Sequence, residues 1–264
     1  MKKIVCIALA LVLALALVAC GSSNSGSADA GKSTASAVKT VESGKLHMST
    51  NAAFPPYEMT TDDGGFEGID VEIAAAIAAK LGLELVVDDM GFNAALLAAQ
   101  NGQSDIVMAG VSVTEDRLKV MEFSDSYATG VQVIIVKEGS AIATADDLGS
   151  AAMIGTQAAT TGYIYCSDDF GEDHVTAFET GALAVQALLN DQVDCVVIDN
   201  MPAQEYVKAN PGLKILETEY VVEDYAIGFA KGNTQLVDAV NAALKELTAD
   251  GTVQKIIDKY ISAA

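Results

Sequence analysis

Short apolar segments alternate with longer segments of helical periodicity in the first half of the chain. The expected strands are 45–50, 83–88 and 105–109. The expected helices are 71–81 and 93–101. Asp70 is predicted to cap the first helix, and Gly82 and Gly102 are predicted to end the two. Such alternation favours an α/β protein with a mostly parallel sheet covered on both faces.

The same alternation restarts in the second half of the chain. The expected elements there are a strand at 152–155, a helix after Thr161, a helix at 182–190 and a strand at 194–198. Extended stretches at 131–136 and 224–230 bracket this unit, and helical segments at 234–247 and 252–261 follow it. The two extended stretches are therefore predicted to be hinge crossings between two lobes.

The predicted first lobe is discontinuous, comprising residues 44–131 plus 229–264, and residues 132–228 form an inserted second lobe. Ligands of open α/β sheets bind beyond the carboxyl ends of the strands. We therefore expect the loops after residues 50, 109, 155 and 198 to meet in a cleft between the lobes.

Composition supports a folded protein with a strongly acidic surface. Apolar residues make up 51% of the 264 residues, enough for one large core or two smaller ones. The formal net charge of -21 disfavours binding to nucleic acids or to anionic membrane surfaces. We read that charge as a well-solvated surface.

The four cysteines give no sign of a metal site. They stand at positions 6, 20, 166 and 195, without a CxxC pair or a Cys/His cluster. Cys166 and Cys195 could form a disulfide, but Cys195 interrupts an apolar run and is more typical of a small buried residue. Neither a metal nor an organic cofactor is expected.

The N-terminal segment has the features of an export signal. Lys2 and Lys3 precede an apolar stretch at 4–18, which is shorter than the ~18–20 residues that span a bilayer. The sequence LVAC at 17–20 resembles the lipobox of bacterial lipoproteins, which implies a signal peptide at 1–19 and a diacylated Cys20. Residues 20–43 are rich in Ser, Gly and Ala and are predicted to form a flexible tether. Ordinary secretion is the alternative.

Several motifs fall in the predicted strand-end loops and helix starts. They are NAAFPPYE at 51–58, GIDV at 68–71, AGVSVTEDR at 109–117, EFSD at 122–125 and GTQAATTG at 155–162. Together they resemble the family 3 extracellular solute-binding proteins, the polar amino-acid binders of ABC importers, over residues 44–264. The resemblance implies a two-lobed fold like that of the type II periplasmic binding proteins.

The same resemblance implies extracytoplasmic capture of a polar L-amino acid and its delivery to an ABC transporter permease. With the lipobox, it implies a protein anchored by its lipid to the extracytoplasmic face of the cell membrane, either at the cell surface or in the periplasm. A monomer is expected, because each lobe can bury its own core.

An amino-acid zwitterion needs donors at its carboxylate and an anion at its ammonium group. Arg117 can form a bidentate pair with a carboxylate, and Ser112 on the same loop can add a hydroxyl and an N–H. Thr160 and Thr161 open a predicted helix, whose N-terminal N–H groups favour an anion. These residues are candidates for carboxylate binding from both lobes.

The remaining candidates rest on the resemblance. It implies that Asp199 accepts the ligand ammonium group and that the carbonyl of Ala109, beside Gly110, is the matching acceptor. Phe54 and Phe92 align with the aromatic residues that sandwich the ligand side chain.

Asn51 and Gln157 align with ligand-discriminating positions. Both are neutral amides, which favours a neutral polar ligand over Lys, Arg or His, with cystine also open, although Asp88 and Asp89 could still supply a negative charge. Ala159 replaces a family glycine.

Each key residue has a simpler structural interpretation. Arg117 could form a surface ion pair, and Asp199 could cap the helix that follows it. Tyr57 is expected in the core, and Phe92 either in the core or in the cleft.

Two other functions remain open at this level. A dehydratase of cyclic precursors of aromatic amino acids could use the same fold, but His47 and His174 form no catalytic motif. A ligand-sensing module is the second alternative.

Overall fold

The computed structural model describes residues 38–149, 153–217 and 219–261. The predicted signal peptide, Cys20 and most of the predicted tether lie outside these residues. Within the described part, no helix is both long enough and apolar enough to span a membrane.

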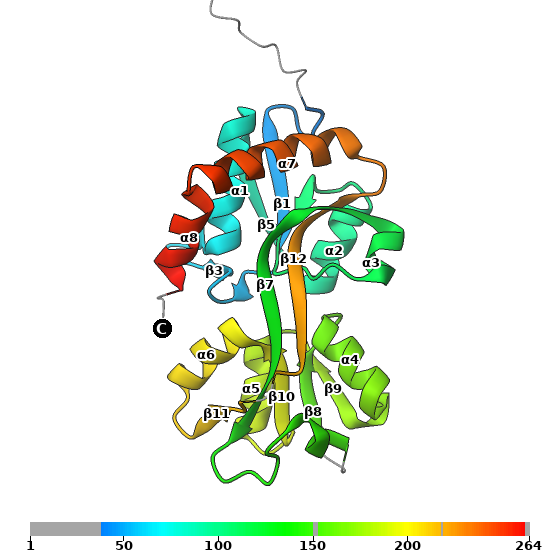
Figure 1. Ribbon diagram of the computed structural model, residues 1–264, viewed down its shortest axis with the longest axis vertical. Helices are drawn as coiled ribbons and strands as arrows, with labels where there is room; N and C mark the ends of the chain where they lie inside the picture. Colours follow the sequence, from blue (N-terminus) through cyan, green and yellow to red (C-terminus); the bar gives the residue numbers. More distant parts are fainter. Residues whose placement is uncertain (1–37, 150–152, 218, 262–264) are drawn as a thin grey trace, which may run out of the picture. The chain divides into compact units, whose positions relative to one another are not determined.

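One group of elements, here called the first lobe, surrounds three parallel strands. They are β5 (Glu84–Asp89), β1 (Lys45–Thr50) and β6 (Ile106–Val107), in that order. The lobe also holds the short strands β2 (Ala53–Phe54), β3 (Glu58–Thr60) and β4 (Phe66–Glu67). Its helices are α1 (Ile69–Leu81), α2 (Phe92–Gln100), α3 (Glu115–Val120), α7 (Thr234–Ala249) and α8 (Thr252–Tyr260). In Figure 1, α7 lies across the top of this lobe and α8 descends along one side.

The prediction that Asp70 caps α1 is wrong. The helix begins at Ile69, two residues earlier than predicted, and has Gly68 as its N-cap. Gly68 has φ 131°, and a Cβ there would lie 2.2 Å from the carbonyl oxygen of Tyr57, so only glycine fits. Asp70 is consequently inside the first turn, fully buried, and accepts hydrogen bonds from the Gly110 N–H and the Tyr127 hydroxyl. Gly82 ends the helix in the left-handed conformation, as expected.

Two long antiparallel strands join the lobes. They are β7 (Met121–Lys137) and β12 (Val221–Ala230), which run side by side between the two halves of Figure 1. β7 is longer than the predicted stretch at 131–136. Its first half was not predicted, because the polar and exposed residues around Asp125 give no apolar pattern there. β7 and β12 also connect the strands of both lobes into one mixed sheet, in the order β5-β1-β6-β12-β7-β10-β8-β9 with β11 on β7.

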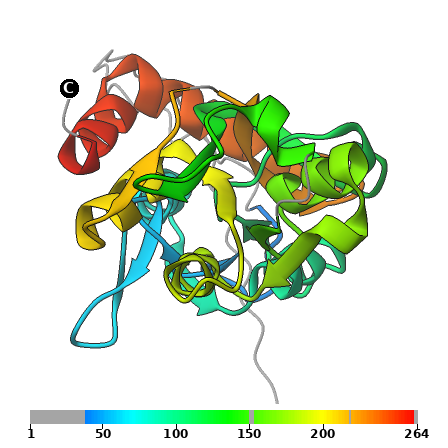
Figure 2. The ribbon, with the colours of Figure 1, turned by 90° about the horizontal axis from the view of Figure 1, so that it is seen from below.

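The second lobe, as the term is used here, contains the elements between these two strands. Its strands are β8 (Ile154–Gln157), β9 (Val175–Phe178), β10 (Cys195–Asp199) and β11 (Leu213–Ile215). Its helices are α4 (Thr161–Phe170), α5 (Gly181–Leu189) and α6 (Asn200–Ala209), with 3-10 turns at Ala145–Gly149 and Glu172–His174. Figure 2 shows the three helices arranged around the strands. β8 pairs in parallel with β9 and β10, so their carboxyl ends point the same way.

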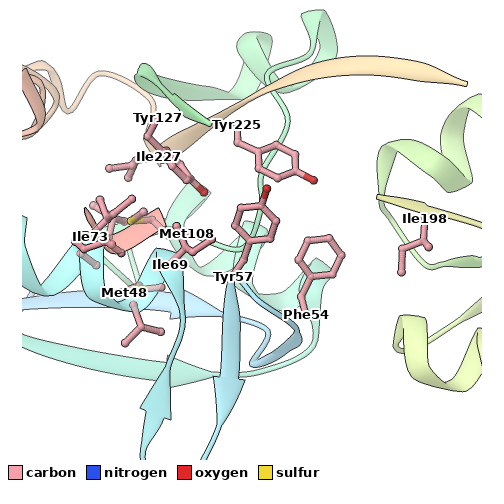
Figure 3. Packing of buried hydrophobic residues seen from close by; sticks show 14 of the residues in the cluster. Met48, Phe54, Tyr57, Ile69, Ile73, Met108, Tyr127, Ile198, Tyr225 and Ile227 are labelled. Atoms are coloured by element: carbon pink, nitrogen blue, oxygen red, sulfur yellow. The ribbon is translucent and has the colours of Figure 1, made fainter. Parts of the chain in front are cut away.

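Buried apolar residues fill both lobes. The largest cluster contains side chains from β1, α1 and α7 together with Tyr57, Tyr127 and Tyr225 (Figure 3). A second cluster lies inside the second lobe and contains Cys166 and Cys195, both free thiols. Burial raises the pKa of each thiol to about 12, so both behave as small apolar residues.

Candidate functional site

A small cavity lies where the two lobes meet. The residues that line it are Asn51, Phe54, Glu58, Phe92, Ala109, Gly110, Ser112, Arg117, Gln157, Thr160, Thr161 and Asp199. Every binding residue predicted from the sequence is therefore in this one cavity, together with Glu58, which was not predicted. The cause is the topology: the chain leaves β1, β6, β8 and β10 at the facing edges of the two lobes. That these residues bind a ligand stays a prediction.

Hydrogen bonds cross between the lobes around the cavity. The Gln157 amide nitrogen Nε2 donates to Asn51 Oδ1 over 2.9 Å, and Arg117 Nη2 donates to the Ala159 carbonyl oxygen over 3.2 Å. On the α6 side, the Tyr206 hydroxyl donates to the Ala53 carbonyl oxygen over 3.2 Å. The lobes are thus closed on one another in this structure.

Arg117 is a buried cation without a carboxylate in direct contact among the described residues. Its side chain is on α3, and the residue is only 9% exposed. Nη1 donates to the Ser112 carbonyl oxygen over 2.9 Å, and the guanidinium carbon lies 5.6 Å from the centre of the Phe92 ring. Burial lowers the pKa of Arg117, which the nearby Glu223 carboxylate partly opposes. The alternative of a surface ion pair is wrong, since the residue is buried and forms no such pair with the described residues.

Asp199 ends β10 and precedes α6, but its side chain caps nothing. The carboxylate forms no capping hydrogen bond to the helix N–H groups. It accepts hydrogen bonds from Gln132 Nε2, over 2.9 Å, and from the Tyr225 hydroxyl. Burial raises the pKa of Asp199 to about 7, the nearby Glu223 adds to this rise, and the two hydrogen bonds oppose it. The helix-cap alternative is therefore wrong, and Asp199 is a buried carboxyl on the second-lobe side of the cavity.

The start of α4 lies at the cavity, which Thr160 and Thr161 line. Thr160 is the N-cap residue, and its hydroxyl accepts from the Tyr163 N–H while donating to the Gln157 carbonyl oxygen. Ala159, before this cap, has φ 63°, a left-handed conformation that glycine adopts at less cost. The loop therefore keeps the backbone shape of a glycine turn although it has alanine.

Aromatic rings form the first-lobe wall. Phe54 stacks on Tyr57 with ring centres 5.8 Å apart, and Tyr57 meets Tyr225 edge-on at 5.3 Å (Figure 3). Tyr57 does not line the cavity and belongs to the core, as predicted. Phe92 lines the cavity and packs against Arg117.

Residues 46–263 of the chain match the protein family described as "Bacterial extracellular solute-binding proteins, family 3". The chain belongs to this family. It is 33% identical to a probable histidine-binding protein of Neisseria gonorrhoeae, over 89% of this chain and 90% of that protein. It is also 33% identical to the arginine-binding extracellular protein ArtP of Bacillus subtilis, over 84% of this chain and 88% of that protein.

Solved structures agree with the sequence relatives. The arginine-, lysine-, histidine-binding protein ArtJ of Geobacillus stearothermophilus superposes with a TM-score of 0.79 at 34% identity, covering 83% of this chain and 96% of that one. An ancestral arginine-binding protein bound to glutamine gives a TM-score of 0.77 at 37% identity, covering 83% and 99%. The fold is thus that of the type II periplasmic binding proteins. Like its relatives, this family 3 protein is a solute-binding protein and not an enzyme.

Glu58 is the cavity residue that sequence reasoning missed. It is fully buried on β3, and with its carboxyl ionised neither oxygen would have a hydrogen-bond donor among the residues that the structure describes. Burial, and then the neighbouring Asp70, raise the pKa of Glu58 well above its usual range. A proton held on Glu58 can be donated to Asp70, which otherwise has one oxygen unpartnered. The signal available in the sequence was a glutamate directly after the apolar run that ends in Tyr57.

Glu223 lies just behind the cavity and was also not predicted. It is 7% exposed on β12 and accepts hydrogen bonds from the Thr161 hydroxyl over 2.8 Å and the Tyr165 hydroxyl over 3.1 Å. Gln132 on β7 donates to both Glu223 and Asp199. Gln132 and Glu223 lie within long strands, where the alternation of side chains does not show which residues face the cavity.

Proposed function

We propose that this protein captures a polar L-amino acid in the cavity between its lobes and delivers it to the permease of an ABC importer. The observation that carries the proposal is a buried arginine from the first lobe and a buried aspartate from the second, both lining one cavity. Opposite charges held on opposite lobes match the two charged ends of a zwitterion. Relatives named as histidine-, arginine-, cystine- and glutamine-binding proteins support it.

The ligand carboxylate would bind at Arg117 and the α4 N-terminus. The guanidinium is already oriented by two backbone carbonyl groups, so it can offer a fork of donors at little cost in entropy. The ligand ammonium group would bind Asp199 and the carbonyl oxygen of Ala109. Phe54 and Phe92 would cover the aliphatic part of the side chain.

We propose that the preferred ligand is an amino acid with a neutral polar side chain. At the Asn51 end, Asn51 Nδ2 donates to the Met90 carbonyl and Gln157 Nε2 donates to Asn51. Asp88 pairs with His47, and Asp89 accepts from the Ala52 N–H, so both acidic candidates are already engaged, and neither lines the cavity. A cationic side chain or cystine is the second choice.

Closure of the lobes would be the signal that the permease reads. The proposed boundaries, with residues 132–228 as the second lobe, put both crossings in β7 and β12. Because ligand groups would contact both lobes only in the closed form, binding shifts the population toward closure. A lipid anchor at Cys20, an extracytoplasmic location and a monomeric state complete the proposal.

The test is a thermal-shift screen of residues 21–264, unfolded and refolded to remove any carried ligand, against the common L-amino acids and cystine. A ligand at a thousand times its Kd stabilises the folded state by about 4 kcal/mol, or about 8–16 °C for this chain length. We expect such a shift with one or a few amino acids in the wild type and none in Arg117→Ala. Lys119→Ala, an exposed cation on the same helix, is the matched control and should shift like the wild type. No shift with any amino acid in the wild type would refute the proposal.

A further inference from the structure

Gln132 lies at the centre of the sheet that joins the lobes. On one side its backbone partner is Asp199 of β10, and on the other it is Val221 of β12, two residues before Glu223. Side chains of neighbouring strands that share a face lie close enough to interact. The sheet register therefore brings Gln132, Asp199 and Glu223 together, and Gln132 is only 1% exposed.

The amide group of Gln132 bridges two buried carboxylates. Nε2 donates to Asp199 Oδ2 over 2.9 Å and to Glu223 Oε2 over 3.1 Å. The same oxygen of Glu223 accepts from the Thr161 hydroxyl over 2.8 Å. One side chain on β7 is thus linked to Asp199, which lines the cavity on the β10 side, and through Glu223 to Thr161, which lines it on the α4 side.

The other end of the amide has no hydrogen-bond partner. Gln132 Oε1 is buried and unpaired among the described residues. It points at Gly162, where an added Cβ would lie only 2.8 Å from it. Turning the amide around would place its carbonyl oxygen against the two carboxylates, which is unfavourable. The two negative charges therefore fix the orientation in which Nε2 faces them. An unpaired buried carbonyl destabilises the fold, and an apolar residue of the same size would fill the space without that cost.

We propose that Gln132 is a positioning residue for ligand capture: its amide holds Asp199 and Glu223 in place, and so links both sides of the cavity to the strands that join the lobes. The inference rests on the proposed function, because it takes Asp199 as the ammonium-binding group. It explains why a glutamine that leaves one polar atom unsatisfied occupies a core position.

The proposal has a consequence for pH dependence. The charged and titratable groups around Asp199 are Tyr225 and Glu223 on β12, Arg117 on α3, Glu58 on β3 and Tyr57 just before that strand. An ammonium group prefers the ionised carboxylate, so affinity falls as pH falls through the pKa of Asp199. The Gln132 N–H stabilises the ionised form, and its removal therefore moves the loss of affinity to higher pH.

The experiment measures ligand affinity by calorimetry from pH 5.5 to 9, using the amino acid that gives the largest shift in the screen. In Gln132→Met, which keeps the size and removes the donor, we expect the midpoint of the affinity loss to rise by about one pH unit, which is about tenfold weaker binding at pH 6. Gln132→Glu replaces the amide donor with a third carboxyl group, which has at most one proton to donate to Asp199 and Glu223. We expect it to move the midpoint of the affinity loss further to higher pH. Gln103→Met, the same change at an exposed glutamine, should leave the profile unchanged.

The possible outcomes separate the two proposals. A wild type that binds no amino acid overturns the proposed function and this inference with it. Alternatively, the wild type binds an amino acid while Gln132→Met keeps the wild-type pH midpoint and has only a lower melting temperature. That result leaves the proposed function standing and overturns the positioning role. If Gln132→Met fails to fold, the midpoint in Gln132→Glu decides, and a wild-type value there overturns the role.

Discussion

Arg117→Met should separate ligand binding from stability. Without ligand, the substitution removes two hydrogen bonds from a charged donor, each worth about 1.5–3 kcal/mol. It also removes a buried cation whose desolvation costs several kcal/mol and which contacts no carboxylate in the described part of the chain. These effects oppose one another, so we expect the free energy of unfolding of the ligand-free protein to change by less than about 2 kcal/mol.

With ligand, the same substitution leaves a buried carboxylate unpaired. Truncating one partner of a buried charge pair costs about 2–5 kcal/mol, which raises Kd by about 30-fold to several thousand-fold. Arg117→Lys keeps the charge but loses the fork of donors, and should fall between wild type and Arg117→Met. The assay is calorimetry on refolded protein, together with urea unfolding of the ligand-free form.

A decarboxylated analogue of the ligand completes the test as a double-mutant cycle. It should bind the wild type far more weakly than the amino acid, and it should bind wild type and Arg117→Met nearly equally. If the analogue loses as much affinity on going from wild type to Arg117→Met as the amino acid does, Arg117 does not bind the carboxylate. A Kd within threefold of wild type in Arg117→Met would refute the assignment directly.

Three further changes test separate parts of the site. Asn51→Asp places a carboxylate at the side-chain end, and should raise the affinity for arginine relative to glutamine at least tenfold in competition calorimetry. Glu58 has a raised pKa, so it binds its proton more tightly in the folded state, and its share of stability is lost as pH rises above about 4.5. Glu58→Gln should therefore raise the melting temperature more at pH 8 than at pH 5, and an equal change at both would contradict the buried-proton reading. Ala159→Gly relieves a left-handed alanine and should raise stability by up to about 1 kcal/mol in urea unfolding, whereas a loss would show that the turn is unstrained.

The fold and the cavity wall could be predicted because their signals are local. β1 begins and ends at the predicted residues, and Gly82 ends α1 as its left-handed cap. Strand-end loops identify cavity residues such as Asn51 and Asp199, since the geometry of an open sheet requires those loops to converge. Both inferences use neighbours in sequence and a general rule of topology.

The supports of the site could not be predicted because they depend on sheet register. Gln132, Glu223 and Tyr225 lie in β7 and β12, and only the pairing of these strands with each other and with β10 brings them to Asp199. The error at Asp70 has a related cause. An acidic residue before an apolar helix usually caps it, but the close approach of Gly68 to Tyr57 moves the helix start and turns the carboxylate into the core.

The hydrogen bonds between the lobes bear on how a ligand would stabilise closure. Asn51–Gln157 and Arg117–Ala159 already cross the cleft with the cavity closed, so part of the closing free energy comes from the protein itself. A ligand adds only the difference between its affinity for the closed and the open form. In the proposed site, Arg117 from the first lobe and Asp199 from the second would make this difference large, because each would contact the same small molecule only when the lobes meet. These two charged groups, more than the apolar walls of the cavity, would then decide whether the closed form reaches the permease.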